Sequence, residues 1–516
     1  MKETSSFTIR NASILVDSGT RFVDVGVRAG RIDAIRRADP ERVKEKGDYD
    51  AKNRLVLPGL IDCHTHLFSL ASLEEMVNLQ GVRSTAEMRR RIRSFKNEMS
   101  QSDTCRGWVL GRGWDQELFV ERRFPTRKDL DRASGDFPAI MTRVCGHVGV
   151  LNTLAIEELS KRKILTSFEE DLVPLSSDGR PTGIVKEAAL EACWNAVTKR
   201  TLKQLKVLFL RAQKTCLGHG LTGVHCILSD DWENELSCIE ELDRKSKLVL
   251  KVSILLPIGA LNRIENLTGK GTVRLKGRNF LVIGFKLYLD GSLGARTAAL
   301  NDPYSDDPRN RGILNYSTQQ LIGYVRRAKR LGFVLACHAI GDRAIEQVLN
   351  AYEHAGIKPE DGFRIEHCSV LRKSLLKQVR IATLCVQPMF SKSDFWIKER
   401  IGESGTRFAY PFRTLHRLTA VIGGSDAPVE SIDPLTGIDA ALKNKNQKES
   451  LTLKESVDLY TKSAALASPM TKDCGTISLG KICDLVILNC SDLGTVSKPE
   501  AEATFVGGKL VSGRFQ

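Results

Sequence analysis

Both ends of the chain alternate apolar and polar residues in short runs, which are separated by Gly, Asp or Asn. Examples are Phe22–Val27 near the start and Cys483–Leu488 near the end. Alternation with a period of two predicts short antiparallel strands. We therefore expect residues 1–55 and 471–516 to form one small β-sandwich domain, assembled from both termini.

The middle of the chain alternates short β-branched runs with longer amphipathic segments, a pattern typical of a parallel sheet covered by helices. The candidate strands are 55–61, 139–144, 222–227, 252–256, 281–289, 334–338, 363–367, 381–386 and 420–424. This is one strand more than an eight-stranded (β/α)8 (TIM) barrel holds. We expect an α/β fold with a barrel over residues 56–470, strand 252–256 outside it, and an inserted subdomain at about 70–135 over its mouth.

Composition narrows the expected partners and location. The 516 residues carry a net charge of +15, but the basic residues are spread out and aromatic residues make up only 6%. We therefore expect no nucleic-acid partner. No run approaches the roughly 18 apolar residues of a membrane helix, and the start of the chain has no signal-peptide core. Thirteen cysteines without a CxxC pair favour a reducing cytoplasm. The expected partner is a small-molecule substrate, and both monomer and homodimer stay open.

Histidines and one aspartate stand at the ends of candidate strands. His64 and His66 close the first strand, and residues two apart on a strand face the same way. His338, His367 and Asp426 end later strands. The loops that follow barrel strands converge at one face. Four imidazoles and a carboxylate in one place would suit Zn²⁺ or a similar divalent ion.

The sequence resembles the amidohydrolase superfamily. Residues 58–66, Pro-Gly-Leu-Ile-Asp-Cys-His-Thr-His, look like its opening signature. More narrowly, the chain is similar to amidohydrolase family 3, which contains N-substituted formamide deformylases and other metal-dependent hydrolases. The supporting segments follow in family order at 111–115, 145–147, 179–183, 286–296, 338–344, 364–367, 424–429 and 480–486.

The resemblance implies a role for each candidate metal ligand. His64 and His66 would bind the more buried metal ion, and His338 and His367 would bind a second one. Asp426 would contact the buried ion and act as the catalytic proton shuttle. Lys286 matches a lysine that relatives carboxylate, so its carbamate would bridge two cations. One ion and two ions both stay open.

Five further residues lie in family motifs and are candidates for substrate binding. They are Trp114, His147, Asp290, Arg296 and Arg343. Arginine and tryptophan side chains also simply pack and form ion pairs, so this structural alternative stays open for them.

The predicted reaction is hydrolysis of a non-peptide C–N bond, in an amide or an N-substituted formamide, by metal-activated water. Asp426 would move the proton from the water to the leaving nitrogen. A cyclic imide, an ester or a heterocyclic amine is the alternative substrate. A non-catalytic amidohydrolase-like binding protein is the alternative of another class, although such a protein would be expected to lose ligands and all six positions are filled here.

Overall fold

Eight parallel strands form the central barrel. The structure is a computed structural model that describes residues 6–17, 19–39, 45, 47–99, 107–197, 200–268, 275–493 and 498–513. The barrel strands follow in the order β6 (Leu60–Thr65), β12 (Leu221–Ile227), β13 (Lys251–Pro257), β14 (Phe280–Tyr288), β15 (Val334–Ala339), β16 (Arg364–His367), β17 (Thr383–Val386) and β18 (Val421–Gly423). Each barrel strand pairs in parallel with the next barrel strand in this order, as a (β/α)8 barrel requires.

The barrel closes where its first strand meets its last. The backbone amide of Asp426 donates to the His64 carbonyl at 2.8 Å, and the His66 amide donates to the Ala427 carbonyl, also at 2.8 Å. The closure therefore brings His64 and His66, called the HxH segment below, beside Asp426, although more than half the chain separates them.

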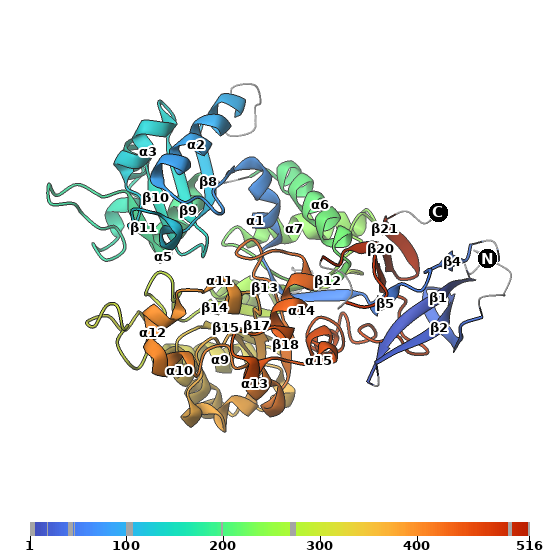
Figure 1. Cartoon of the computed structure of the whole chain (residues 1–516). Coiled ribbons are helices and arrows are strands. Elements are labelled where there is room, and N and C mark those ends of the chain that lie inside the picture. The colour runs from blue at the N-terminus through green and yellow to red at the C-terminus, as the bar shows by residue number, and fades with distance from the viewer. Residues whose placement is uncertain are drawn as a thin grey trace.

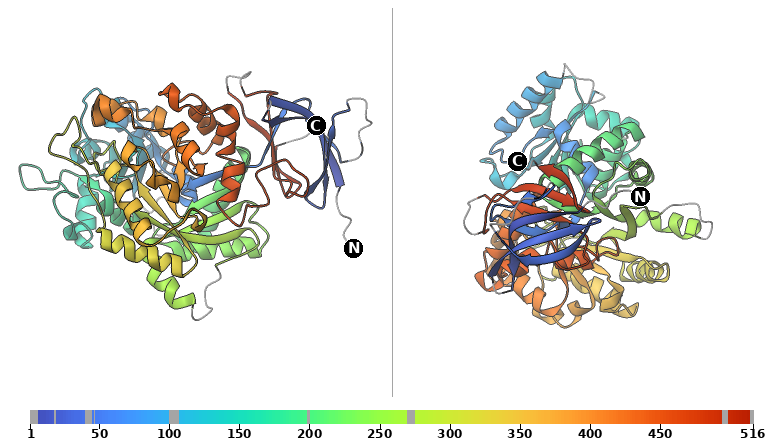
Figure 2. Two further views of the ribbon diagram at one scale, coloured as in Figure 1. Left: turned by 90° about the horizontal axis from the view of Figure 1, so that it is seen from below. Right: turned by 90° about the vertical axis from the view of Figure 1, so that its right-hand side faces the viewer.

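Helices cover the outside of the barrel (Figures 1 and 2). They are α6 (Leu202–Gly218), α7 (Trp232–Arg244), α8 (Leu261–Thr268), α9 (Thr318–Arg330), α10 (Asp342–His354), α13 (Phe412–Leu418), α14 (Pro434–Leu442), α15 (Leu453–Asp458) and α16 (Lys462–Leu466). Two further helices lie at the mouth of the barrel. The Phe390 ring of α11 (Phe390–Ser393) stacks on that of His367 with centroids 5.7 Å apart, and α12 (Ile397–Thr406) packs against Tyr304 and Ile340 in loops that follow barrel strands. Helix α9 shows why such segments are helical. Ser317 and Gln320 form a capping box at its start, and Leu321, Val325 and Ala328 face the core at helical spacing. No helix in the described ranges is long and apolar enough to cross a bilayer.

The two ends of the chain share one sheet, drawn at the right of Figure 1. Its strands are β1 (Ser6–Val16), β2 (Gly19–Arg28), β3 (Arg31–Arg37), β4 (Tyr49–Asp50), β5 (Leu55–Pro58), β19 (Leu485–Leu488), β20 (Ala501–Val506) and β21 (Lys509–Gly513). The order is β21-β20-β19-β5-β1-β2-β3, with β4 beside β1. Apolar residues from both ends, including Val25, Val56 and Phe505, form a separate core under this sheet.

A second α/β unit is inserted after β6 and lies at the upper left of Figure 1. It follows α1 (Leu67–Ser72), and its five-stranded sheet has the order β11-β10-β9-β8-β7. The elements are β7 (Val77–Asn78), α2 (Thr85–Met99), β8 (Val109–Trp114), α3 (Arg127–Ser134), β9 (Ala139–Arg143), β10 (Val148–Leu151), α4 (Thr153–Lys161), β11 (Ile184–Lys186) and α5 (Glu187–Val197). This inserted unit therefore runs well past residue 135, the end that the sequence predicted.

Three strand assignments from the sequence were wrong. Segment 55–61 is not one barrel strand, because residues 55–58 are β5 of the terminal sheet and barrel strand β6 begins at Leu60. Segment 139–144 is β9 of the inserted sheet, whereas 252–256 is β13 and belongs to the barrel. Strand β9 is buried on both faces, because Met141 packs toward α2 and α3 while Ile140 packs toward α4 and α5. A strand covered on both faces has the same continuous apolar pattern as a barrel strand, so the pattern could not separate them.

Candidate active site

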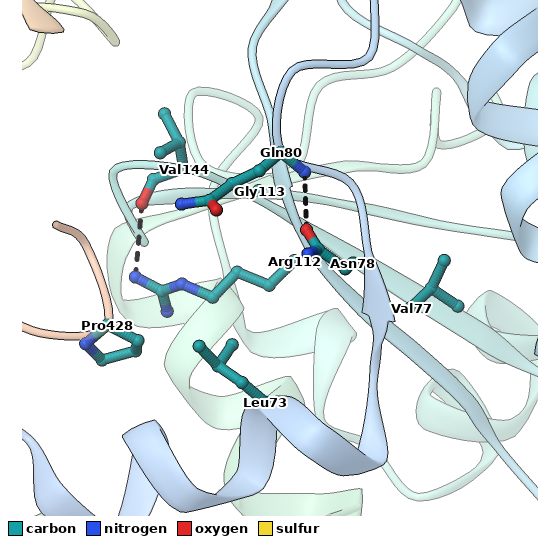
Figure 3. A pocket seen from close by; sticks show the side chains of 8 residues that line it. All are labelled: Leu73, Val77, Asn78, Gln80, Arg112, Gly113, Val144 and Pro428. Carbon is teal, nitrogen blue, oxygen red and sulfur yellow. Dashed lines mark hydrogen bonds between the residues drawn. The ribbon is translucent and has the colours of Figure 1, made fainter. Parts of the chain in front are cut away.

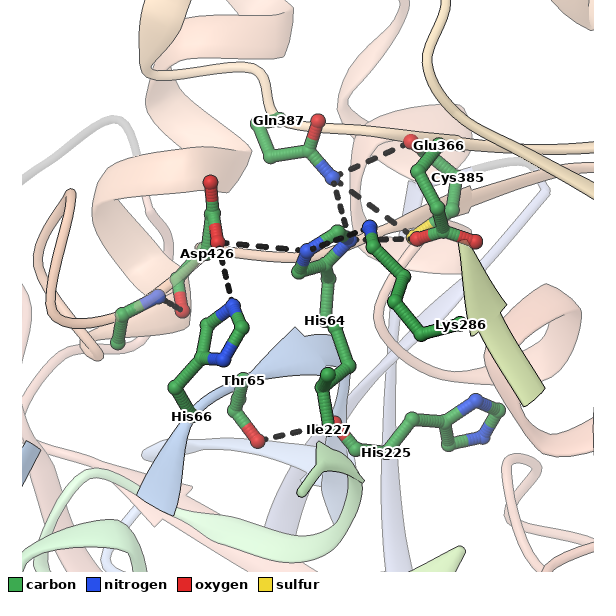
Figure 4. A network of polar contacts seen from close by, with 12 residues as sticks. His64, Thr65, His66, His225, Ile227, Lys286, Glu366, Cys385, Gln387 and Asp426 are labelled. Atoms are coloured by element: carbon green, nitrogen blue, oxygen red, sulfur yellow. Dashed lines mark hydrogen bonds and ion pairs between the residues drawn. The ribbon is translucent and has the colours of Figure 1, made fainter. Parts of the chain in front are cut away.

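The six predicted metal ligands meet at the C-terminal ends of the barrel strands. The rings of His64 and His367 lie 5.0 Å apart between centroids, those of His338 and His367 4.4 Å, and those of His64 and His66 5.8 Å. The Lys286 Nζ is 3.5 Å from His64 Nε2. The convergence expected from the positions of these residues at strand ends is therefore present in the structure. Figure 4 shows His64, His66, Lys286 and Asp426 of this set.

Asp426 lies between the two histidines of the HxH segment. Its Oδ1 is 3.3 Å from His64 Nε2 and 3.2 Å from His66 Nε2. Burial raises the pKa of Asp426, but His64, His66 and His367 outweigh burial and hold this pKa well below its usual range. The carboxylate is therefore ionised, as a metal ligand or a proton acceptor must be.

The backbone around this carboxylate is fixed by a buried aspartate. Asp62 accepts hydrogen bonds from the backbone amides of His64 and Ser425, each at 3.0 Å. Asp426 itself has a φ of +58° and His367 a φ of +72°. Non-glycine residues rarely adopt this left-handed region, and such strained positions cluster at functional sites.

Three of these residues form a group that fits a cation. One ligand atom each from His64, His367 and Asp426 lies within 4.8 Å of the other two. Burial holds the pKa of His367 well below its ordinary value, so the ring is neutral, and its buried Nδ1 has no hydrogen-bond partner. A neutral imidazole with an unsatisfied nitrogen is what a divalent ion requires.

The other predicted ligands lie at the edge of this group. His338 Nε2 is 3.0 Å from the Gly291 carbonyl and 3.5 Å from Asp290 Oδ1. Lys286 is fully buried, and in the described part of the chain no carboxylate lies within ion-pair distance of its amine. Burial lowers the pKa of Lys286. A lowered pKa favours the neutral amine, the form that carboxylation requires.

Glu366 is a site residue that the sequence reasoning missed. Its Oε2 is 2.5 Å from His64 Nδ1, and its two oxygens also accept from Arg364 at 2.8 and 3.0 Å. Arg364 in turn lies 2.7 Å from His225 Nδ1. The period-two spacing of Arg364 and Glu366, one residue before His367, was the available signal, since it places both inside the barrel.

The five candidate substrate residues are not gathered in one place. His147 lies beside His338, one of the predicted metal ligands, with 5.5 Å between the two ring centroids. Its Nδ1 is 2.8 Å from Glu187 Oε2. Burial lowers the pKa of His147, but the Glu187 carboxylate outweighs burial and raises it to about 9. His147 is therefore a cationic donor beside the site.

The remaining four make structural contacts. Trp114 is completely buried in the core of the inserted unit, and its indole donates to the Met141 carbonyl at 2.8 Å. Asp290 accepts from the amides of Ala299, Ile340 and Gly341, which ties two barrel loops together. Arg296 pairs with Asp306, and Arg343 donates to the carbonyls of Arg311 and Gly312. Their roles in substrate binding stay predictions.

The inserted unit meets the barrel at a pocket, one wall of which comes from the loop after barrel strand β18. The pocket is lined by Leu73, Val77, Asn78, Gln80, Arg112, Gly113, Val144 and Pro428 (Figure 3). Pro428 follows Asp426 by two residues, so the loop that carries Asp426 also forms part of the pocket wall. Burial lowers the pKa of Arg112 while Asp426 raises it, so the two groups are near enough to interact electrostatically.

Comparison with known proteins agrees with the geometry. The sequence profile described as the amidohydrolase family matches residues 49–512. The YtcJ protein of Bacillus subtilis is 28% identical over 96% of this chain and 97% of its own length. The N-substituted formamide deformylase of Arthrobacter pascens is 23% identical over 96% of this chain and 97% of its own.

A solved structure shows the same architecture. It is an uncharacterised metal-dependent hydrolase from Pyrococcus horikoshii, which is 30% identical with a TM-score of 0.75. The match covers 95% of this chain and 99% of that one.

Proposed function

Because the chain belongs to the amidohydrolase family of metal-dependent hydrolases, we propose that it hydrolyses a carbon–nitrogen bond outside a peptide, in an amide or an N-substituted formamide. The observation that carries the proposal is the buried group of His64, His367 and Asp426 at the C-terminal ends of the barrel strands. The formamide is suggested by the relative named as a formamide deformylase, which aligns along almost its full length.

We propose that His64, His367 and Asp426 hold a divalent ion, and that His66, His338 and Lys286 complete a site for one or two ions. Nitrogen and oxygen ligands of this kind suit Zn²⁺. When bound, such an ion supplies Lewis acidity for the scissile carbonyl and lowers the pKa of a water molecule toward about 7.

The protein's own residues supply the proton transfers. Asp426 is ionised and lies at the barrel mouth, where it can accept a proton from the attacking water and deliver it to the leaving nitrogen. Glu366 holds the His64 ring in one orientation through Nδ1. His147, as a cationic donor beside His338, can hydrogen-bond to an oxygen of the substrate.

Lys286 is proposed to be carboxylated. Its amine, in the neutral form, would attack CO₂ and lose one proton to solvent, which forms a carbamate anion with two oxygens. That anion would offset the mutual repulsion of two divalent ions. Intact-protein mass spectrometry under CO₂ should show the mass of one added CO₂, and Lys286→Met should abolish the addition.

Metal removal tests the proposed function. The purified protein, stripped with a chelator and then reloaded with Zn²⁺ or Mn²⁺, is assayed on a panel of N-alkyl formamides, acyl amides, cyclic imides, esters and amino-heterocycles. We expect loss of hydrolysis on stripping, recovery on reloading, and the highest kcat/KM among the formamides and amides. Full activity in the metal-free protein would overturn the mechanism, and a preference for another class would replace the substrate. No hydrolysis of any class would favour the non-catalytic alternative.

A further inference from the structure

Arg112 is a half-buried cation that has no anionic partner among the described residues. It comes from strand β8 of the inserted unit, and its guanidinium makes one hydrogen bond, from Nη2 to the Val144 carbonyl at 3.3 Å (Figure 3). Its Nε is buried and has no acceptor. No carboxylate of the described residues lies within 4.0 Å of it, whereas the nearby Arg143 is paired with Asp115. A buried guanidinium nitrogen without an acceptor is costly unless something else satisfies it.

The surrounding backbone leaves room for this guanidinium. Gly146 has a φ of +82°, and a Cβ there would lie 3.1 Å from Arg112 Nη2. A larger residue would press on the guanidinium and would also be strained at that φ. The glycine of the Cys145-Gly146-His147 motif therefore leaves the space that the Arg112 guanidinium occupies.

The pocket around Arg112 is suited to a small monoanion. Arg112 is the single charged residue among the lining residues, and Leu73, Val77, Val144 and Pro428 are apolar. One guanidinium has the planar fork of donors that matches one carboxylate. A phosphate dianion would leave a net negative charge inside these apolar walls.

We propose that Arg112 binds a carboxylate of the substrate, so the substrate is an amide or formamide that carries a carboxylate and a short apolar group beside the scissile bond. The inference rests on the proposed function, because Pro428, on the loop that carries Asp426, lines the pocket. The inserted unit thereby supplies the residue that selects the substrate, while the barrel supplies the chemistry.

Two probes of nearly equal shape test this assignment. N-formyl-leucine and N-formyl-leucinamide differ in the carboxylate alone, and they are assayed with wild type, Arg112→Gln and Arg112→Lys. The matched control is Arg90→Gln, which removes an exposed arginine from α2 of the same unit. We expect wild type and the control to prefer the carboxylate in kcat/KM by about 10- to 100-fold, the equivalent of one hydrogen bond to a charged group.

Arg112→Gln should abolish that preference, because the amide cannot pair with the carboxylate, and Arg112→Lys should keep part of it because it keeps the charge but loses the fork. Equal use of both probes by wild type, or an equal loss for both in Arg112→Gln, would overturn the assignment. Circular dichroism checks that each variant folds.

A binding measurement separates failure of this inference from failure of the proposed function. If the metal-loaded wild type hydrolyses neither probe, calorimetry with the metal-free protein still decides about Arg112. Tighter binding of the carboxylate probe that disappears in Arg112→Gln would support the site even without turnover. Equal binding of both probes, or no binding of either, would overturn it.

Discussion

The Nδ1 atom of His64 lies 2.5 Å from Oε2 of Glu366, and both side chains are almost completely shielded from solvent. Burial raises the pKa of Glu366, but Arg364 and His64 outweigh burial and hold this pKa well below its usual range. The ionised carboxylate accepts a hydrogen bond from the Nδ1–H of His64, so His64 presents Nε2 toward Asp426. Carboxylates behind metal-binding imidazoles fix the tautomer in this way.

Glu366→Gln should therefore weaken metal affinity by about 10- to 100-fold. It should also lower the free energy of unfolding by about 3–5 kcal/mol, because Arg364 loses its buried partner. The double variant Arg364→Met/Glu366→Gln should recover part of the stability but none of the affinity. Competition with a chromophoric chelator and urea unfolding measure the two effects. Wild-type metal affinity in either variant would contradict the positioning role.

Asp426→Asn should reduce kcat by at least about 10²-fold at saturating metal, because an amide cannot accept the proton from water. The fold should survive, since the backbone amide of residue 426 still donates to the His64 carbonyl. The control Asp473→Asn removes a half-exposed surface carboxylate and should leave kcat unchanged. Comparable turnover in the two variants would remove Asp426 from the mechanism.

Trp114→Phe distinguishes packing from substrate contact. The indole donates to the Met141 carbonyl inside the inserted unit, so its loss should cost about 1–3 kcal/mol of stability. KM and kcat of the folded variant should not change. Unfolding curves and steady-state kinetics check both parts. A tenfold rise in KM at unchanged stability would instead show that Trp114 contacts substrate.

Glu235, on helix α7, should make the free energy of unfolding depend on pH. Burial raises the pKa of this α7 carboxyl from 4.5 to about 7, against the opposing effect of hydrogen bonds from Ser229. Between these two values the folded state binds a proton that the unfolded state has lost. This contribution therefore weakens stability as pH rises from about 4.5 to about 7, by up to about 3 kcal/mol.

Glu235→Gln should remove that slope, because its amide is neutral at every pH and can still hydrogen-bond to Ser229. The variant should equal wild type near pH 4 and exceed it at pH 8 in urea unfolding. A wild-type stability difference between pH 5 and 8 that persists unchanged in the variant would show that Glu235 is not its source.

The sequence predicted the barrel and the residues that meet at its mouth, because ligands at strand ends need no knowledge of the loops. It could not tell strand 139–144 from strand 252–256, because both are buried on two faces. Glu366 and Arg112 were missed for a different reason. The role of Glu366 depends on its contact with His64 across the barrel. That of Arg112 depends on a buried nitrogen without an acceptor. The sequence around each residue contains neither kind of information.

One strand pairing in the terminal sheet affects when the barrel can fold during synthesis. Strand β19 pairs with β5, and Gly59, the residue that links β5 to barrel strand β6, donates to the Asp484 carbonyl at 2.7 Å. The anchor of the strand that carries His64 and His66 thus comes from a segment that the ribosome synthesises long after that strand. Barrel strand β6 lacks this anchor until residue 484 has emerged, so a competent metal site should arise only after that point of translation.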